Sequence, residues 1–162
     1  MHNFKISTYL KGIFLISLFS LISAFYIEYV LGHKPCNLCL IQRIPYVISI
    51  VLIVLNHVLK KDEYFTILLL ILTFSFSLIM SSYHFGIEQG YFEESIVCGL
   101  KDTSSILTKE ELLKQLQTKP VSCKDVTFKI FGFSLTTFNI MLSLILIVLL
   151  LNIFKNYEKY KK

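Results

Sequence analysis

Four long apolar runs dominate this chain of 162 residues. They cover about residues 12–31, 40–59, 64–84 and 131–154. A helix rises about 1.5 Å per residue and a bilayer core is about 30 Å thick, so about 20 apolar residues span it. Because lipid offers the backbone no hydrogen-bond partner, each run is expected to be helical. The sequence therefore predicts an all-α membrane protein, a four-transmembrane-helix bundle in a single domain over residues 1–162.

The composition supports a membrane protein over a soluble one. Hydrophobic residues make up 54% of the chain and charged residues only 17%, against about 45–50% and about 25% in soluble domains. The net charge of +5 does not indicate a nucleic-acid partner, because the sequence has no basic stripe with interleaved stacking residues. The first run is interpreted as a retained anchor, because Phe25 and Tyr26 follow Ala24 where a signal peptide would have small residues.

The distribution of lysines predicts the orientation of the bundle. With four spans, both termini and the short turn at 60–63 lie on one side of the membrane. Cytoplasmic segments are enriched in Lys and Arg, so we expect this lysine-dense side to be cytoplasmic. The other side then receives two loops, at about 32–39 and 86–130. The lysines that decide the orientation are Lys5, Lys11, Lys60, Lys61, Lys155, Lys159, Lys161 and Lys162.

All four cysteines fall in the two loops on the outer side. Cys36 and Cys39 lie in the first loop, and Cys98 and Cys123 lie in the second. An exported compartment permits disulfides. Four cysteines allow three connectivities, and the spacing alone does not choose among them.

Cys36 and Cys39 form a C-x-x-C pair at the edge of the second span. We expect Cys39 to lie at the N-terminus of that helix, where the helix dipole favours a thiolate. Arg43 is four residues later, on the same helix face, and its charge would favour the thiolate further. Arg43 is therefore a candidate to hold a polar group such as a quinone carbonyl beside Cys39. The alternative is an arginine that snorkels to the head groups.

Other polar residues near the outer edge carry two interpretations each. His84 is either a hydrogen-bond partner for a quinone oxygen or an interfacial histidine in an aromatic belt. Glu28 is interpreted as interfacial, with an ion pair to Arg43 as the alternative. Glu88 is interpreted as a solvated loop residue or a cap. Within the second loop, Thr108 and the residues after it predict a short amphipathic helix that begins with a capping box.

Several motifs resemble the DsbB family of membrane disulfide-forming oxidoreductases. Residues 36–43 resemble its C-x-L-C-x-x-Q-R motif, and residues 83–88 resemble Y-H-x-G-[VI]-E. Residues 132–139 resemble the opening of the last span, and Cys98 and Cys123 match the second cysteine pair. The resemblance covers nearly the whole chain. One departure is Phe128, where the family often has a tryptophan.

The resemblance implies a thiol:quinone oxidoreductase in the bacterial inner membrane, with its cysteine loops in the periplasm. Its partner would be a DsbA-like thioredoxin-fold protein, and its acceptor a quinone, ubiquinone or menaquinone. Cys98 would form the mixed disulfide with the partner, and Cys123 would exchange with Cys36. Cys39 would pass electrons to the quinone, with Arg43 and His84 as quinone-binding residues. No metal site is implied.

Three alternatives remain open from the residues. A four-cysteine zinc site fits Cys36 and Cys39 but fits the wide spacing of Cys98 and Cys123 poorly. A vitamin-K-epoxide-reductase-like protein also combines a C-x-x-C pair with a quinone, although its pair usually comes later in the chain. A family variant dedicated to one thioredoxin-fold partner would change the client and keep the chemistry.

Overall fold

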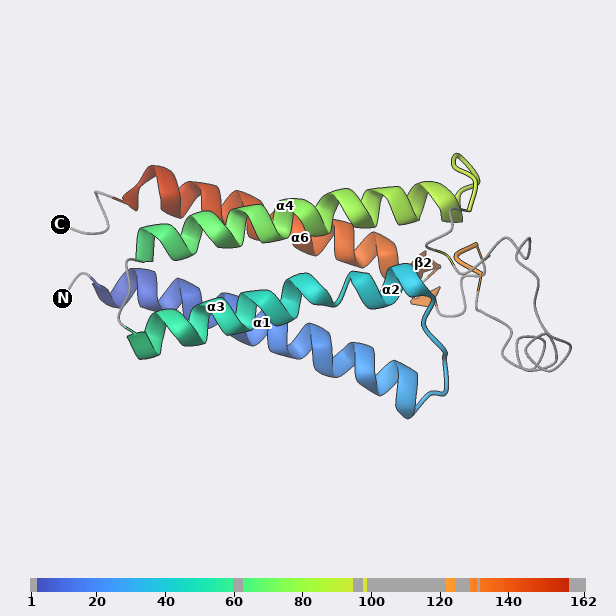
Figure 1. The fold of residues 1–162 in the computed structure, drawn as a ribbon, viewed down its shortest axis with the longest axis horizontal. Helices are drawn as coiled ribbons and strands as arrows, with labels where there is room; N and C mark the ends of the chain where they lie inside the picture. The colour runs from blue at the N-terminus through green and yellow to red at the C-terminus, as the bar shows by residue number, and fades with distance from the viewer. Residues whose placement is uncertain are drawn as a thin grey trace, which may run out of the picture.

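The computed structural model describes residues 3–59, 63–94, 98, 122–124, 129–130 and 132–157. Its long helices lie side by side in one bundle, shown in Figure 1. Helix α1 packs on α3, α3 packs on α4, and α4 packs on α6. A short antiparallel pair of strands precedes α6, and Gly132 has a φ of 85° in the turn between them. The elements are α1 Asn3–Tyr29, α2 Asn37–Ile41, α3 Ile44–Leu59, α4 Glu63–Glu88, β1 Lys129–Ile130, β2 Phe133–Ser134 and α6 Leu135–Lys155.

Four segments are long and apolar enough to cross a membrane, which confirms the predicted four-helix membrane bundle. They are Ile6–Tyr29, Asn37–Leu59, Glu63–Glu88 and Leu135–Lys155. The ends differ from the predicted spans because helices continue into polar residues that hydropathy alone excludes. Helix α4 runs four residues beyond His84, so the second outer loop begins after Glu88 and not at residue 86.

Buried serines line the helix interfaces, while large apolar side chains face outward. Ser77 on α4 bonds Ser143 on α6 at 3.0 Å, and Ser49 on α3 donates to Ser17 on α1 at 2.8 Å. Small polar residues let membrane helices approach closely and hydrogen-bond across the interface. Exposed side chains such as Phe19 and Ile79 are suited to contact with lipid tails. These serine contacts lie within an otherwise largely apolar interior, in which Phe74 and Leu146 are fully buried.

A break in the second span separates α2 from α3. Residues Gln42 and Arg43 form a turn there, and Pro45 follows as the second residue of α3. Proline has no N–H and its ring crowds the carbonyl four residues earlier, so a continuous helix cannot pass Pro45 undisturbed. At this break, Gln42 contacts His84 on α4, whereas Arg43 contacts Glu28 on α1.

The termini and the cysteine-bearing segments lie at opposite ends of the bundle. Figure 1 shows both chain ends at one end, with α2 and β2 at the other. This is the topology that four membrane crossings require. The amphipathic helix predicted after Thr108, and the departure at Phe128, lie outside the described residues.

Candidate functional site

Cys36 and Cys39 meet at the N-terminus of α2. Cys36 is the N-cap, with extended backbone, and its sulfur accepts a hydrogen bond from the Cys39 N–H at 3.4 Å. The two sulfurs also lie 2.9 Å apart and share a hydrogen bond. Both residues are free cysteines, and Cys36 is the more buried of the two. The pair is therefore asymmetric, because the Cys36 sulfur accepts the N–H at the start of α2.

This asymmetry differs from the sequence-based expectation. The sequence placed the thiolate on Cys39, because the helix was expected to begin nearer that residue. The helix instead begins one residue after Cys36, so the Cys36 sulfur accepts the otherwise unpaired N–H of Cys39. The hydrogen bond between the two sulfurs lowers the pKa of Cys36 to about 4, with burial opposing and His84 adding to the effect. In the reduced pair, Cys36 holds the negative charge.

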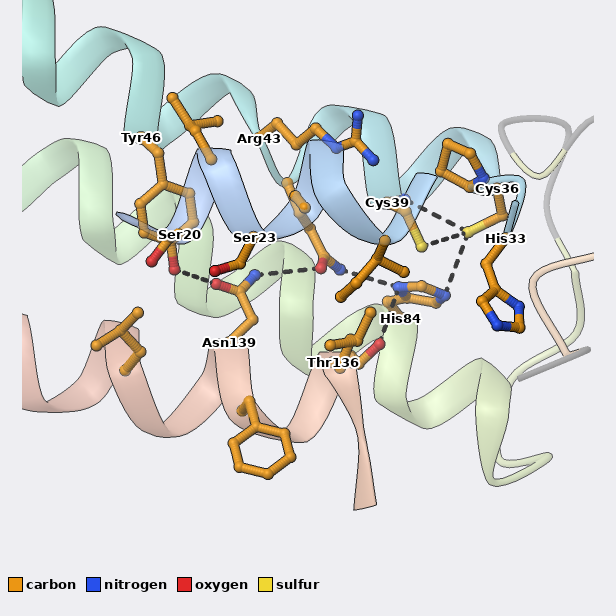
Figure 2. Close-up of a pocket in the computed structure, with 18 of the residues that line it drawn as sticks. Ser20, Ser23, His33, Cys36, Cys39, Arg43, Tyr46, His84, Thr136 and Asn139 are labelled. Carbon is orange, nitrogen blue, oxygen red and sulfur yellow. Dashed lines mark hydrogen bonds between the residues drawn. The ribbon is translucent and has the colours of Figure 1, made fainter. Parts of the chain in front are cut away.

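His84 lies in the interior beside the dithiol. Its side chain is only 2% exposed, so the interpretation of His84 as an interfacial belt residue is wrong. Nε2 is 3.6 Å from the Cys36 sulfur. Nδ1 lies 3.0 Å from the side-chain nitrogen of Gln42 and 3.3 Å from the Thr136 hydroxyl. Figure 2 shows the imidazole between the cysteines and α6. His84 therefore connects α2, α4 and α6.

Glu88 lies beside the imidazole of His84. It lies in the last turn of α4, where its side chain is 6% exposed and 3.7 Å from His84 Nε2. Its carboxylate accepts hydrogen bonds from Ser134 and from Thr136. The prediction of a solvated loop residue is wrong, because α4 continues and carries Glu88 against the start of α6. Glu88 instead joins α4 to β2 and α6.

Arg43 forms an ion pair with Glu28 across the α1–α3 interface. The guanidinium donates to the Glu28 carboxylate at 2.5 Å and lies 5.1 Å from the centre of the Phe25 ring. Both charged side chains are about four-fifths buried, so the alternative in which Glu28 pairs with Arg43 is confirmed. Arg43 is held by α1 and is not directed only at Cys39.

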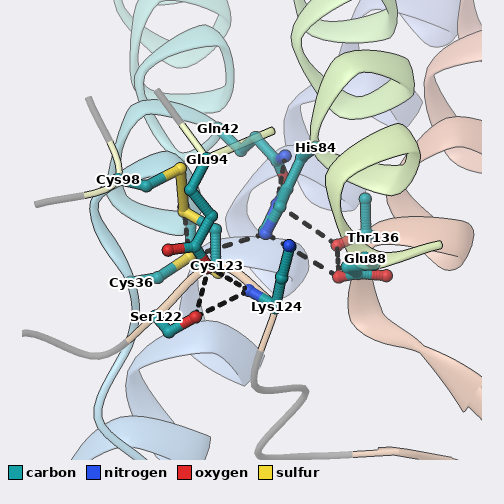
Figure 3. Close-up of a disulfide and its surroundings, with 11 residues drawn as sticks. Cys36, Gln42, His84, Glu88, Glu94, Cys98, Ser122, Cys123, Lys124 and Thr136 are labelled. Carbon is teal, nitrogen blue, oxygen red and sulfur yellow. Dashed lines mark hydrogen bonds and ion pairs between the residues drawn. A yellow bond between two sulfur atoms is a disulfide. The ribbon is translucent and has the colours of Figure 1, made fainter. Parts of the chain in front are cut away.

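Cys98 and Cys123 form a disulfide that packs against Cys36. Figure 3 shows the two sulfurs next to the Cys36 side chain. Glu94 holds the segment that contains Cys123, because its carboxylate accepts from the Ser122 hydroxyl and from the Lys124 N–H at 3.0 Å. These bonds lower the pKa of Glu94 below its usual value, with Ser122 as the main cause. The disulfide also removes Cys98 and Cys123 from the four-cysteine zinc alternative.

A cavity of about 690 Å³ opens beside the dithiol. One wall is apolar and comes largely from α1, including Leu15 and Phe19. The opposite wall carries polar side chains from the second span, from α4 and from α6. It includes Cys39, Arg43, His84 and Asn139, which Figure 2 labels. The cavity thus combines an apolar wall with a polar end at the sulfur atoms.

A chain of buried hydrogen bonds forms the polar wall. Asn139 donates to Gln42 at 3.1 Å and to Ser81 at 2.6 Å, and it accepts from the Tyr46 hydroxyl. These residues and Thr136 were not among the predicted site residues. Gln42 and Asn139 nevertheless belong to the motifs at 36–43 and 132–139, which was the available signal. Their shared role depends on helix packing that a sequence pattern does not specify.

The described residues also contain one group of donor atoms that could hold a metal ion. The sulfurs of Cys36 and Cys39 and a ring nitrogen of His84 lie within 4.8 Å of one another. The sequence-based predictions named no metal ligands, and the zinc alternative used a different set. The geometry therefore adds a possibility that the cysteine spacing did not indicate.

The fold and the site define a multi-pass membrane protein with a dithiol and a disulfide packed together at one end of a helical bundle. The profile of the family described as "Disulfide bond formation protein DsbB" matches residues 7–153. This chain belongs to the DsbB family, which supports a role as a disulfide-forming oxidoreductase. The family assignment favours that role over the vitamin-K-epoxide-reductase-like alternative.

A bacterial protein is similar in sequence to this chain over most of its length. The chain is 28% identical over 137 residues to the uncharacterized protein RP370 of Rickettsia prowazekii (strain Madrid E). The alignment covers 83% of this chain and 80% of the relative. The similarity therefore extends over most of both proteins, and the relative's name adds no activity.

Proposed function

We propose that this protein reoxidises a periplasmic DsbA-like thioredoxin-fold protein and passes the electrons to a membrane quinone. The observation that carries the proposal is the packing of the Cys98–Cys123 disulfide against Cys36, whose partner Cys39 lines the cavity. A disulfide suited to a soluble partner and a dithiol suited to a lipid-soluble acceptor are thus adjacent. Electrons can pass between them by thiol–disulfide exchange.

The exchange begins at the second cysteine pair. A thiolate of the partner attacks Cys98, the Cys98–Cys123 bond breaks, and Cys123 leaves as a thiolate. Cys123 then attacks Cys36 of an oxidised Cys36–Cys39 pair, and Cys39 leaves as a thiolate. The second thiolate of the partner attacks its own sulfur in the mixed disulfide and releases Cys98. The partner departs oxidised, and its two electrons remain on the protein.

The electrons then collect on the first pair. Cys98 attacks Cys123 in the Cys36–Cys123 disulfide, which restores Cys98–Cys123 and releases Cys36 as a thiolate. The free thiols of Cys36 and Cys39 beside an intact Cys98–Cys123 disulfide correspond to this stage. The low pKa of Cys36 supports this step, because a more acidic thiol is the better leaving group.

The cavity fits a quinone ring, because it joins an apolar wall to hydrogen-bonding groups beside Cys39. When bound, a quinone accepts two electrons and two protons and becomes a quinol. Arg43 and His84 would hold the ring, since both line the cavity. The Glu28 carboxylate keeps the Arg43 guanidinium in place, and Gln42 and Thr136 orient the His84 imidazole. Ubiquinone and menaquinone both remain candidates.

The proposed location is the bacterial inner membrane, with both termini in the cytoplasm and the cysteine loops in the periplasm. The support comes from the lysine distribution and from the position of both termini at the end opposite α2 (Figure 1). In this orientation the disulfide meets an oxidising compartment, where a structural or catalytic disulfide persists.

The experiment that tests the function uses the full chain in lipid nanodiscs. A reduced thioredoxin-fold protein is added with ubiquinone or menaquinone, and quinone absorbance is followed together with partner thiols. We expect one quinone to be consumed for every two partner thiols lost. A Cys98→Ser control should stop both signals, because the partner has no disulfide to attack. Loss of partner thiols without quinone consumption would contradict the electron route.

A further inference from the structure

Three metal-ligand atoms converge on one point at the base of the cavity. They are the sulfurs of Cys36 and Cys39 and Nε2 of His84. Cys36 is 6% exposed and His84 is 2% exposed, so bulk water has little access to either ligand. All three atoms lie within 4.8 Å of one another. Two thiolates and an imidazole are the ligand types that zinc and cadmium ions prefer.

The spacing of these atoms is close to that of a tetrahedral site. With a Zn–S bond of about 2.3 Å and a Zn–N bond of about 2.0 Å, the sulfur and nitrogen of one tetrahedron lie about 3.5 Å apart. The Cys36 sulfur lies 3.6 Å from His84 Nε2. Two sulfurs on one zinc ion lie about 3.8 Å apart, and the Cys36–Cys39 distance is 2.9 Å. A shift of about 1 Å in one sulfur would complete the tripod.

The surroundings of His84 favour coordination through Nε2. Coordination through Nε2 requires the ring proton on Nδ1, and the Thr136 hydroxyl, 3.3 Å away, can accept that N–H because its own hydrogen goes to Glu88. The Gln42 amide nitrogen at 3.0 Å is a donor, so the amide must turn when the metal binds. Metal-bound histidines usually donate their other N–H to such an acceptor. The Glu88 carboxylate lies 3.7 Å from Nε2 and adds negative charge beside the ligands. Cys36, Cys39 and His84 thus supply three of the four ligands of a tetrahedral ion.

We propose that the reduced Cys36–Cys39 pair, together with His84, is a binding site for a thiophilic divalent cation such as Zn²⁺ or Cd²⁺. Binding displaces the thiol proton that the reduced pair still holds and leaves the oxidation state of sulfur unchanged. The site exists only while Cys36 and Cys39 are reduced, because a disulfide has no thiolate to offer. A bound cation therefore removes both sulfurs from thiol exchange.

The test titrates Cd²⁺ into the full chain carrying Cys98→Ser and Cys123→Ser, so that Cys36 and Cys39 are the only thiols. The reduced protein is freed of reductant, and the ultraviolet band of cadmium–thiolate bonds is measured. We expect one Cd²⁺ per chain, with no band after the pair is oxidised. His84→Ala should weaken the affinity at least tenfold, whereas His57→Ala, at the far end of α3, should leave it unchanged.

An equal affinity in the His84→Ala variant would overturn the proposal, and so would the absence of a cadmium–thiolate band. X-ray absorption of the zinc-loaded double-serine protein provides a second measurement that does not alter His84. We expect two sulfur ligands and at least one imidazole nitrogen, and two sulfurs with oxygen ligands alone would contradict the site. Neither measurement uses a quinone or a partner protein, so its result is independent of the proposed function.

Discussion

The Cys36 sulfur accepts a hydrogen bond from the Cys39 backbone N–H at 3.4 Å and lies 2.9 Å from the Cys39 sulfur, with which it shares a second hydrogen bond. Both contacts come from the first turn of α2, for which Cys36 is the N-cap. Together they stabilise a thiolate on Cys36. The two cysteines of the C-x-x-C pair therefore have different chemical roles in the reduced protein.

The first prediction concerns the reactivity of Cys36. The lowered pKa, about 4, means that Cys36 remains a thiolate from neutral pH down to about pH 5. Alkylation of the reduced Cys98→Ser/Cys123→Ser protein should modify Cys36 before Cys39, with a rate that declines only as pH falls toward 4. Mass spectrometry of the two labelled sites measures the order. Cys39→Ala should raise the pKa of Cys36, because the main side-chain hydrogen bond that lowers it is lost.

The second prediction separates the two halves of the reaction. Cys39→Ser should abolish quinone reduction, because serine cannot form the Cys36–Cys39 disulfide. The mixed disulfide between Cys98 and the partner should still form, since Cys98 and Cys123 are unchanged. Non-reducing electrophoresis detects that complex, and absorbance measures quinone loss. Normal quinone turnover in this variant would exclude the role proposed for Cys39.

The third prediction concerns the ion pair between Arg43 and Glu28. Arg43→Ala should raise the apparent KM for quinone about tenfold or more, in line with the loss of about 1.5–3 kcal/mol for a hydrogen bond to a charged group. Glu28→Gln keeps the guanidinium and should raise KM less. Arg43→Lys is the matched control for charge without the planar fork of donors. An unchanged KM in all three variants would indicate that Arg43 extends to the head groups and does not bind the quinone.

The four helices were predictable because each apolar run is long enough to cross a bilayer. The residue at which α2 begins was not predictable. An error of a few residues placed Cys39, and not Cys36, at the N-terminus of the helix. The position of Glu88 was missed for a related reason. Helix α4 continues past the apolar run, because Ser134 and Thr136 supply hydrogen bonds to the Glu88 carboxylate from another element.

Contacts between distant elements were the least predictable part of the site. The cysteines, Arg43 and His84 were named from motifs. All of them line one cavity except Cys98, which is bonded to Cys123. The pairing of Arg43 with Glu28 depends on how α1 packs against α3, which neither hydropathy nor spacing determines. The contacts between Gln42, Asn139 and His84 likewise require three elements to be placed together.

The fourth prediction tests the buried polar network. Asn139→Ala removes the partner of Gln42, Ser81 and Tyr46 at once, and leaves their polar groups inside the bundle. Hydrogen bonds between membrane helices are worth about 0.6 kcal/mol on average, with larger losses when a buried group is left unpaired. We expect a loss of about 1–3 kcal/mol in unfolding free energy. Denaturation in detergent measures it.

Asn156→Ala is the matched control for this loss. Asn156 is the C-cap of α6, and its bonds to Asn152 are exposed. Asn156→Ala should change the free energy of unfolding by less than about 0.5 kcal/mol, as is usual for surface substitutions. Equal effects of Asn139→Ala and Asn156→Ala would show that the interior network does not contribute specifically.

The fifth prediction concerns the way Glu94 holds Cys123 near Cys36. Its carboxylate accepts hydrogen bonds from residues on both sides of Cys123, and these bonds stabilise the charged form. The pKa of Glu94 is lower in the folded protein than in the unfolded one. The stability that Glu94 contributes is therefore fully present above the unfolded pKa and is lost as pH falls through the folded pKa. Glu94→Ala should therefore slow the exchange between Cys123 and Cys36 several-fold at neutral pH. The measurement is rapid acid quenching followed by mapping of the Cys36–Cys123 disulfide.

Glu93→Ala, one residue away, should leave the rate unchanged, because Glu93 makes neither of these bonds. If both variants slow the exchange equally, general loop charge and not the Glu94 contacts controls the approach of Cys123 to Cys36.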